Sequence, residues 1–318
     1  MTLLDGKQIA ATIRAELRAE IDALRASGQR VPRLGIVIVG HNPASETYVA
    51  NKIKACQEVG FQAERIALET DISEADLLRE VHRLNTDPAI DGFIVQLPLP
   101  THINESTILS AIDYRKDVDG LTPENVGRTV QGLPSIVSAT PRGIRELLAR
   151  YNIPTAGRHV VVIGRSNIVG KPVAMLLMQR PYLSLPGMSA SSLGDATVTI
   201  CHSKTQDLPA ICRTADIIIV AAGSPGLLTA DMVRPGATVI DVGINRVEIP
   251  NANANANANA NAKANANANA NYRLVGDVDF PAVAPLCDYI TPVPGGVGPM
   301  TIVSLLQNTL QAYKNHKS

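Results

Sequence analysis

Apolar positions along the chain follow two periods that alternate from one stretch to the next. In residues 5–26 the apolar side chains recur at steps of three and four, which predicts an amphipathic helix with a charged outer face. Residues 34–39 form a continuous apolar run, typical of a strand buried on both faces. Further strands are predicted at 62–68, 90–95, 160–163, 196–201, 215–221 and 238–242. Because strands and helices alternate, we predict an α/β fold of mostly parallel sheets flanked by helices.

Proline and glycine predict several boundaries between these elements. Thr140-Pro141 is expected to cap a helix that links to a second unit, whereas Pro123 and Gly127 predict a loop. Residues 291–301 contain three glycines and three prolines, which predicts a rigid loop against which a flat ligand can lie. A last helix is predicted from about residue 302 to residue 313.

One stretch combines a strand, a tight turn and the start of a helix. The run 160–163 breaks at Gly164, and periodic apolar sequence resumes after Gly170. This arrangement can receive the pyrophosphate of a dinucleotide, although its spacing is G-x-S-x-x-x-G and not G-x-G-x-x-G. Such a turn alone is about as common in α/β proteins that bind no cofactor as in those that bind one. Arg165 and Ser166 favour a cofactor loop, because a cation and a hydroxyl could hold a ribose 2′-phosphate.

The composition describes an ordinary globular chain with room for two domains. The 318 residues are 45% apolar and 18% charged, and 29 basic residues balance 29 acidic ones, so neither a nucleic-acid nor a membrane partner is expected. Four scattered cysteines without metal-binding spacing predict reduced core residues and no metal site. We find no leader-peptide pattern or apolar run of membrane-spanning length, which makes the cytoplasm the expected location.

Two segments are not expected to belong to the packed core. Residues 251–271 alternate Asn and Ala around Lys263, so they have little to bury and are predicted to be disordered or an engineered insert. Their flanks, 245–248 and 272–279, are predicted to form the two arms of a hairpin. Residues 180–194, rich in Pro, Gly and Ser, predict a surface loop.

Five motifs occur together in a fixed order. They are Tyr48–Lys52 (YVANK), Val95–Pro100 (VQLPLP), Lys116–Gly120 (KDVDG), Gly164–Pro172 (GRSNIVGKP) and Pro292–Thr301 (PVPGGVGPMT). With these motifs, the chain resembles the bifunctional methylenetetrahydrofolate dehydrogenase/cyclohydrolase family over about residues 3–313, interrupted mainly at 180–194 and 250–271.

The resemblance implies an NADP-linked oxidation of 5,10-methylenetetrahydrofolate to the methenyl form. Hydrolysis to 10-formyltetrahydrofolate would follow in the same cleft. It implies a folate-binding catalytic domain at 1–150, completed by 293–318, and an NADP-binding Rossmann-type domain at 151–292. The last helix would return to the first domain, and two chains would form a homodimer through their cofactor domains.

Three residues match the catalytic set of the family. Lys52 matches the catalytic lysine, and burial in a cleft could lower its pKa enough for general acid/base work. Gln96 could hydrogen-bond the Lys52 amine without adding charge, and Asp119 matches the acid that binds the pterin. The neighbouring Asp117 is expected to be structural. Outside this context, most lysines on helices are simply solvated, and the glutamine could merely cap a loop.

The resemblance also carries over substrate and cofactor contacts. Tyr48 would stack on the aminobenzoyl group, or would otherwise be a half-buried core aromatic. The folate wall would further comprise Leu97, Pro98, Gly295, Gly298 and Pro299. Arg165 and Ser203 would hold the 2′-phosphate, which favours NADP, since NAD enzymes usually place a carboxylate there. The remaining cofactor contacts would be Gly164, Ser166, Ile168, Gly223, Gly243, Ile244 and Thr301.

Two alternatives remain open at this point. The protein could be a dehydrogenase with little cyclohydrolase activity, because Lys52 and Gln96 would serve both activities. It could also be a module that binds NADP or folate without turnover. The presence of Lys52, Gln96 and Asp119 argues against this second alternative, since a protein that only binds could lose them freely.

Overall fold

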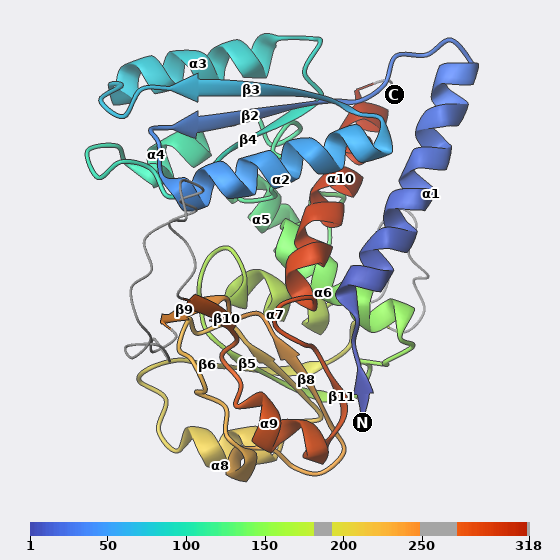
Figure 1. Cartoon of the computed structure of the whole chain (residues 1–318), viewed down its shortest axis with the longest axis vertical. Coiled ribbons are helices and arrows are strands. Elements are labelled where there is room, and N and C mark those ends of the chain that lie inside the picture. The colour runs from blue at the N-terminus through green and yellow to red at the C-terminus, as the bar shows by residue number, and fades with distance from the viewer. Residues whose placement is uncertain (181–192, 249–271, 317–318) are drawn as a thin grey trace, which may run out of the picture.

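The computed structural model describes residues 1–180, 193–248 and 272–316 and forms two lobes, each built on a parallel sheet (Figure 1). Helix α10 (Val297–Asn315) starts at the junction of the two lobes and extends into the smaller lobe in Figure 1. It packs against α6 (Ala139–Arg150) and against α1 (Gly6–Ala26). The last helix therefore returns to the first lobe, as predicted.

The smaller sheet has the strand order β3-β2-β4, with all strands parallel. Its strands are β2 (Arg33–Val39), β3 (Gln62–Leu68) and β4 (Gly92–Val95). The helices of this lobe are α1, α2 (Pro43–Val59), α3 (Glu74–Thr86) and α4 (Glu105–Ser110). Helix α3 begins directly after its N-cap residue Ser73, whose hydroxyl accepts the Asp76 N–H.

The larger sheet has the order β1-β11-β8-β7-β5-β6 and is also parallel throughout. Its strands are β1 (Thr2–Leu3), β5 (His159–Ile163), β6 (Thr197–Cys201), β7 (Ile217–Val220), β8 (Ala237–Asp241) and β11 (Cys287–Ile290). Helices α7 (Gly170–Met178), α8 (Leu208–Arg213) and α9 (Phe280–Val283) belong to this lobe. The predicted hairpin is present as β9 (Asn245–Glu248) and β10 (Tyr272–Val275).

Two predicted segments lie largely or wholly outside the described residues. They are the Asn-Ala tract at 251–271 and most of the predicted surface loop at 180–194. The described end of that loop is not on the surface, because Leu193 is buried in the core. The proposed limits of the two domains stay a prediction.

The loop predicted around Pro123 and Gly127 is wrong, because residues 123–131 form helix α5 (Pro123–Gln131). The Thr122 hydroxyl caps its start by accepting the Asn125 N–H. Pro123 stands in the first turn, where a missing N–H costs nothing, and Gly132 closes the helix with a positive φ. Pro123, which suggested a loop, therefore stands at the start of the helix, and Gly127 is tolerated inside it.

Two other helix boundaries differ from the prediction. Helix α6 begins at Ala139 after Ser138, so Thr140-Pro141 lies inside its first turn. Helix α10 begins at Val297 and not at 302, so the second half of the glycine- and proline-rich run is helical. Pro299 fits there because the first turn of a helix leaves its N–H groups without helical partners.

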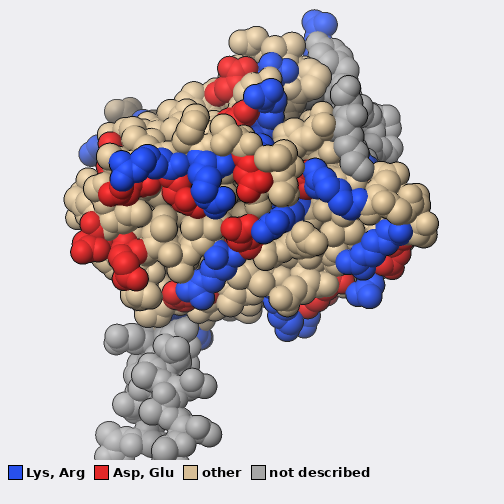
Figure 2. Space-filling model, turned by 90° about the horizontal axis from the view of Figure 1, so that it is seen from above, with Lys and Arg blue, Asp and Glu red and all other residues tan. Residues whose placement is uncertain are grey.

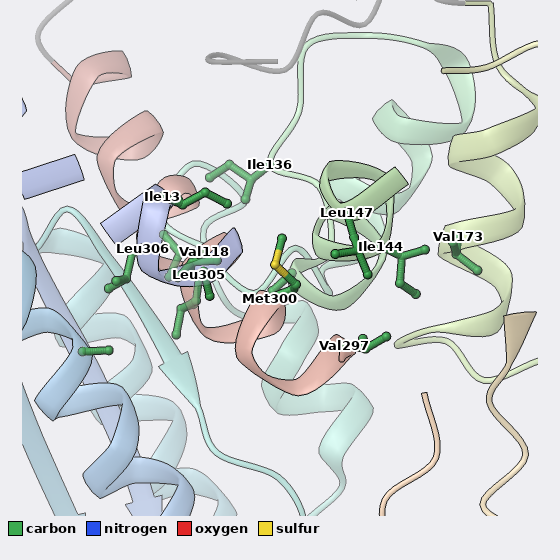
Figure 3. Packing of buried hydrophobic residues seen from close by; sticks show 14 of the residues in the cluster. Ile13, Val118, Ile136, Ile144, Leu147, Val173, Val297, Met300, Leu305 and Leu306 are labelled. Carbon is green, nitrogen blue, oxygen red and sulfur yellow. The ribbon is translucent and has the colours of Figure 1, made fainter. Parts of the chain in front are cut away.

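The core that joins the lobes gathers around Met300 (Figure 3). In Figure 3, Ile13 of α1 lies on one side of it and Ile144 and Leu147 of α6 on the other, with Val173 of α7 beyond Ile144. All of these side chains are at most 1% exposed. Helix α10 is thus packed on several sides, and its burial fixes the positions of elements from both lobes.

Several polar groups inside this core are paired. Arg142, 1% exposed, donates to the side chains of three polar residues on α10, which are Gln307, Asn308 and Gln311. The Asn308 amide donates to the backbone carbonyls of Val118 and Val137. These bonds tie α10 to α6 and to the segment that carries Asp119.

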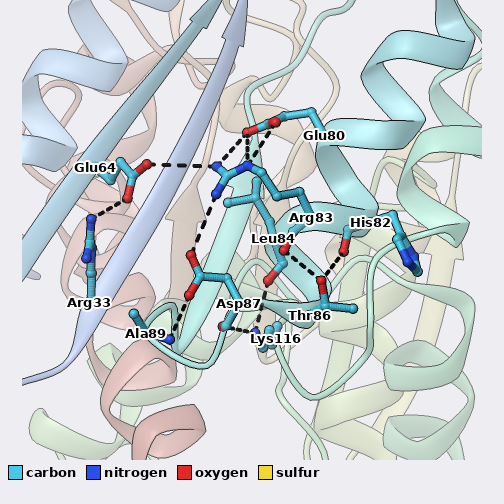
Figure 4. Close-up of polar contacts among 10 residues, drawn as sticks. All are labelled: Arg33, Glu64, Glu80, His82, Arg83, Leu84, Thr86, Asp87, Ala89 and Lys116. Atoms are coloured by element: carbon cyan, nitrogen blue, oxygen red, sulfur yellow. Dashed lines mark hydrogen bonds and ion pairs between the residues drawn. The ribbon is translucent and has the colours of Figure 1, made fainter.

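The outer face of the smaller lobe carries mixed charges. Figure 2 shows basic and acidic side chains interleaved over it. Arg83 pairs with Glu64, Glu80 and Asp87 at 2.6 to 3.8 Å (Figure 4). Such exposed pairs contribute little to stability individually and screen one another's field.

No helix within residues 1–180, 193–248 and 272–316 is long and apolar enough to cross a membrane. The four cysteines, all within these ranges, are buried and free, as predicted for reduced core residues.

Candidate active site

Lys52 and Gln96 meet at the carboxyl edge of the smaller sheet. Helix α2 carries Lys52 and follows β2, whereas Gln96 comes directly after β4. Lys52 Nζ donates to Gln96 Oε1 at 3.0 Å, so the hydrogen bond that the sequence suggested is present. The Gln96 Nε2 group donates to the Leu97 carbonyl at 2.7 Å, which turns the amide oxygen toward the lysine.

The electrostatics of this pair are set by burial and by Asp119. Burial lowers the pKa of Lys52, and the Asp119 carboxylate partly opposes that shift. Burial likewise raises the pKa of Asp119, and Lys52 acts in the opposite direction. Lysine and carboxylate are therefore close enough to influence one another's pKa in partly desolvated surroundings. This is the environment that brings an amine closer to proton exchange at neutral pH.

The charged residues of the KDVDG motif have different roles. Lys116 donates to the carbonyls of Leu84 and Asp87 at the end of α3 (Figure 4). Asp117 is 1% exposed and accepts from the Gly120 and Thr122 N–H groups and from the Asn125 amide. The prediction that Asp117 is structural is confirmed. Asp119 remains as the acid of this motif that interacts with Lys52.

Tyr48 lies one helical turn before Lys52 on α2. Its side chain is 47% exposed, which is more than expected for a core aromatic. A ring that is half exposed beside Lys52 can offer one face to a flat ligand.

The glycine-rich run at the start of α10 brings the predicted substrate and cofactor walls together. A cavity of about 150 Å³ is lined by residues 241–244, at the end of β8, and by residues 292–299. Gly243 and Ile244 from the cofactor set thus lie beside Gly295, Gly298 and Pro299 from the substrate set. Thr301 follows on α10, and its hydroxyl shares a hydrogen bond of 3.0 Å with that of Thr140 on α6.

A larger cavity of about 580 Å³ opens between the lobes. Leu97, Gly120 and Leu121 line it from the smaller lobe, and Ile168 and Lys171 line it from the larger one. Its size is that of a small-molecule site. The sequence patterns did not indicate Leu121, Lys171 or the Thr140–Thr301 contact. The first two adjoin predicted site residues, and proximity along the chain could have indicated them.

The turn between β5 and α7 has the close packing that a dinucleotide needs. Gly164 has φ 128°, and a Cβ atom on it would overlap the Ala221 carbonyl oxygen. A Cβ on Gly170 would overlap the Gly164 carbonyl oxygen, so both positions require glycine. The Ser166 hydroxyl accepts the N–H groups of Val169 and Gly170 and holds the turn closed. These residues form a compact helix N-terminus that can approach a pyrophosphate.

The sheet register places Arg165 and Ser203 at the same edge. Ile163 at the end of β5 pairs with Cys201 at the end of β6. Arg165 and Ser203 each follow by two residues, and both are exposed. A cation and a hydroxyl on neighbouring loops fit the phosphate on an adenosine ribose, and a carboxylate would not.

Comparison with known proteins connects this arrangement to a family. Residues 4–119 match the family model of the tetrahydrofolate dehydrogenase/cyclohydrolase catalytic domain, and residues 138–317 match that of its NAD(P)-binding domain. The bifunctional protein FolD of Porphyromonas gingivalis is 55% identical over 312 residues, which cover 98% of this chain and 97% of that protein.

Solved structures agree with these matches. The bifunctional enzyme FolD of Campylobacter jejuni, a methylenetetrahydrofolate dehydrogenase/cyclohydrolase, has a TM-score of 0.85 and 43% identity, with 99% of each chain covered. The Trypanosoma brucei N5,N10-methylenetetrahydrofolate dehydrogenase-cyclohydrolase, complexed with NADP cofactor and inhibitor, has a TM-score of 0.84 and 39% identity. That match covers 99% of this chain and 97% of the other.

Proposed function

Because the chain belongs to the tetrahydrofolate dehydrogenase/cyclohydrolase family, we propose that both of its activities use the cleft that holds Lys52, Gln96 and Asp119. The protein oxidises 5,10-methylenetetrahydrofolate to the methenyl form with NADP and hydrolyses that product to 10-formyltetrahydrofolate. Of the hypotheses raised by the sequence, the bifunctional enzyme is the one its relatives support. The hydrogen bond between Lys52 and Gln96 carries our assignment of the site.

In the oxidation, bound NADP supplies the acceptor for a hydride. The protein's task is to align the folate with it. We assign the 2′-phosphate to Arg165 and Ser203 and the pyrophosphate to the turn from Gly164 to Ile168. Tyr48 would stack on the aminobenzoyl ring, and Asp119 would accept hydrogen bonds from the amino-pyrimidine edge of the pterin. Leu97, Pro98 and the run from Gly295 to Pro299 would shape the remaining wall.

In the hydrolysis, water must attack the methenyl carbon between two nitrogens. Neutral Lys52 takes a proton from the water as the new C–O bond forms. The resulting ammonium returns that proton to N5 as the bond between the carbon and N5 breaks. The hydroxyl on that carbon releases its own proton to solvent at the same time, and its oxygen becomes the carbonyl of the formyl group on N10. Gln96 keeps the amine directed into the cleft in both protonation states, because its oxygen accepts from either form.

Gln96→Leu should lower the rate of methenyl hydrolysis about 10- to 100-fold, since a hydrogen bond to a charged group contributes about 1.5–3 kcal/mol. Leucine keeps the approximate volume but offers Lys52 no acceptor. The loss of methenyltetrahydrofolate absorbance without NADP measures this rate. The matched control is Gln57→Leu on the exposed face of α2. If the two variants hydrolyse at the same rate, Gln96 does not position Lys52.

We also propose that two chains form a homodimer through the larger sheet. Within the described residues, β6 stands at the end of the strand order β1-β11-β8-β7-β5-β6. An edge strand offers free backbone groups for pairing or must be covered. Sedimentation equilibrium should then give twice the 33.7 kDa of one chain, and a monomer at micromolar concentration would refute the dimer. The four reduced, buried cysteines support the proposed cytoplasmic location.

A further inference from the structure

We propose that Asp277 is a positioning residue that holds the cofactor loops of the larger lobe in their binding conformation. This inference rests on the proposed cofactor site. Asp277 follows the β9–β10 hairpin, and it is 0% exposed. Asp277 is not among the catalytic, substrate-binding or cofactor-binding residues proposed above.

The Asp277 carboxylate accepts four hydrogen bonds. Oδ2 accepts from the N–H groups of Ala222 at 2.7 Å and Gly223 at 2.8 Å. Oδ1 accepts from the Ser224 N–H and from the Asn245 side-chain amide, both at 2.8 Å. Three successive backbone donors of the loop after β7 therefore converge on one buried carboxylate. A loop held in this way cannot relax without leaving that charge unpaired.

A second carboxylate fixes Asp277 itself. Asp241 ends strand β8, is 3% exposed, and accepts from the N–H groups of Gly243, Asp277 and Val278 at 2.9 to 3.1 Å. Burial raises its pKa to about 6, so at neutral pH Asp241 is ionised and acts only as an acceptor. The end of β8, the loop after it and the segment of Asp277 are thus one hydrogen-bonded unit.

Two glycines allow the close packing within this unit. A Cβ on Gly243 would overlap the Asp277 carboxyl, and a Cβ on Gly276 would overlap the Asp241 carboxyl. Strands β7 and β8 are neighbours in the sheet, so the two loops lie at the same carboxyl edge. That edge is where dinucleotides bind in open α/β sheets. Gly223, Gly243 and Ile244, our proposed cofactor contacts, are therefore held in place by Asp277 and Asp241.

The test is Asp277→Asn, because the amide puts N–H groups where the loop already presents donors. We expect the KM for NADP to rise about 10- to 100-fold with kcat nearly unchanged. The KM for NAD should rise by the same factor, since Asp277 does not read the 2′-phosphate. Methenyl hydrolysis without cofactor should stay within about twofold of wild type, which shows that the chain is folded.

The matched control is Asp279→Asn, two residues further along and half-buried, which should leave every constant unchanged. If Asp277→Asn does not fold, Asn245→Ala removes a single uncharged donor and should raise both cofactor KM values a few-fold. Unchanged KM values, or an equal loss of both activities in a folded variant, would overturn the inference. If the cofactor binds elsewhere, Arg165→Ala will also leave its KM unchanged, which separates the two failures.

Discussion

Lys52→Met is expected to abolish methenyl hydrolysis while leaving the affinity for NADP nearly unchanged. General acid–base catalysis contributes about 10²- to 10⁴-fold to a rate, and we expect a loss of that size. Methionine keeps an unbranched chain of similar length in the cleft but can neither accept nor donate the proton. Apart from Thr301 on α10, the proposed cofactor contacts lie on the other lobe, so we expect NADP binding not to involve this side chain. Methenyl absorbance and NADP titration measure the two quantities.

The control for this substitution is Lys54→Met on the same helix. Lys54 is exposed to solvent and stands two residues away, so it points from a different face of α2. It should retain wild-type hydrolysis and wild-type oxidation. If Lys52→Met keeps more than about a tenth of the wild-type hydrolysis rate, Lys52 is not the group that transfers the proton.

Arg165→Ala should weaken the binding of NADP more than that of NAD. The preference for NADP over NAD should fall about 10- to 100-fold. A charge-assisted bond between a guanidinium and a phosphate is among the strongest that a protein surface makes. Because NAD lacks this phosphate, its affinity for the variant should change little. The KM for each cofactor in the dehydrogenase assay gives the preference directly.

Arg158→Ala is the matched control, because Arg158 precedes β5 and Arg165 follows it. The two arginines therefore lie at opposite edges of the same sheet. Arg158 pairs with Asp216 at 3.7 Å. This variant should keep the wild-type preference for NADP. Equal losses for NADP and NAD in Arg165→Ala would show that Arg165 does not recognise the 2′-phosphate.

Much of the fold was predictable because its elements have strong local patterns. Strands β2 and β5 consist mainly of continuous apolar runs. Ser73, a typical N-cap residue, marks the start of helix α3. The contact between Lys52 and Gln96 was also predictable. Each residue follows a strand of one parallel sheet, and such ends meet at one edge.

Other features depend on partners that a local pattern cannot reveal. Strand β1 has only two residues and becomes a strand because β11, near the far end of the chain, pairs with it. The Thr140–Thr301 contact joins residues 161 positions apart. The unit of Asp241 and Asp277 likewise exists only once the loops after β7 and β8 have packed. In each case the sequence supplies the polar group, but tertiary structure determines what it binds.

Helix α5 shows a different limit. Proline and glycine favour loops on average, yet Pro123 occupies the first turn and Gly132 the end of a helix. Position relative to the cap, and not residue type, decided the outcome. The hydroxyl of Thr122 was the signal that could have indicated it.

The most direct test of this account is the pH profile of methenyl hydrolysis, corrected for the uncatalysed rate, in wild type and Lys52→Met. Water activation requires the neutral amine, so the rate should rise with pH through an apparent pKa below the ordinary lysine value of 10.5. Lys52→Met should lack this rise altogether. If the same rise persists in Lys52→Met, another group activates the water, and the central role of Lys52 is contradicted.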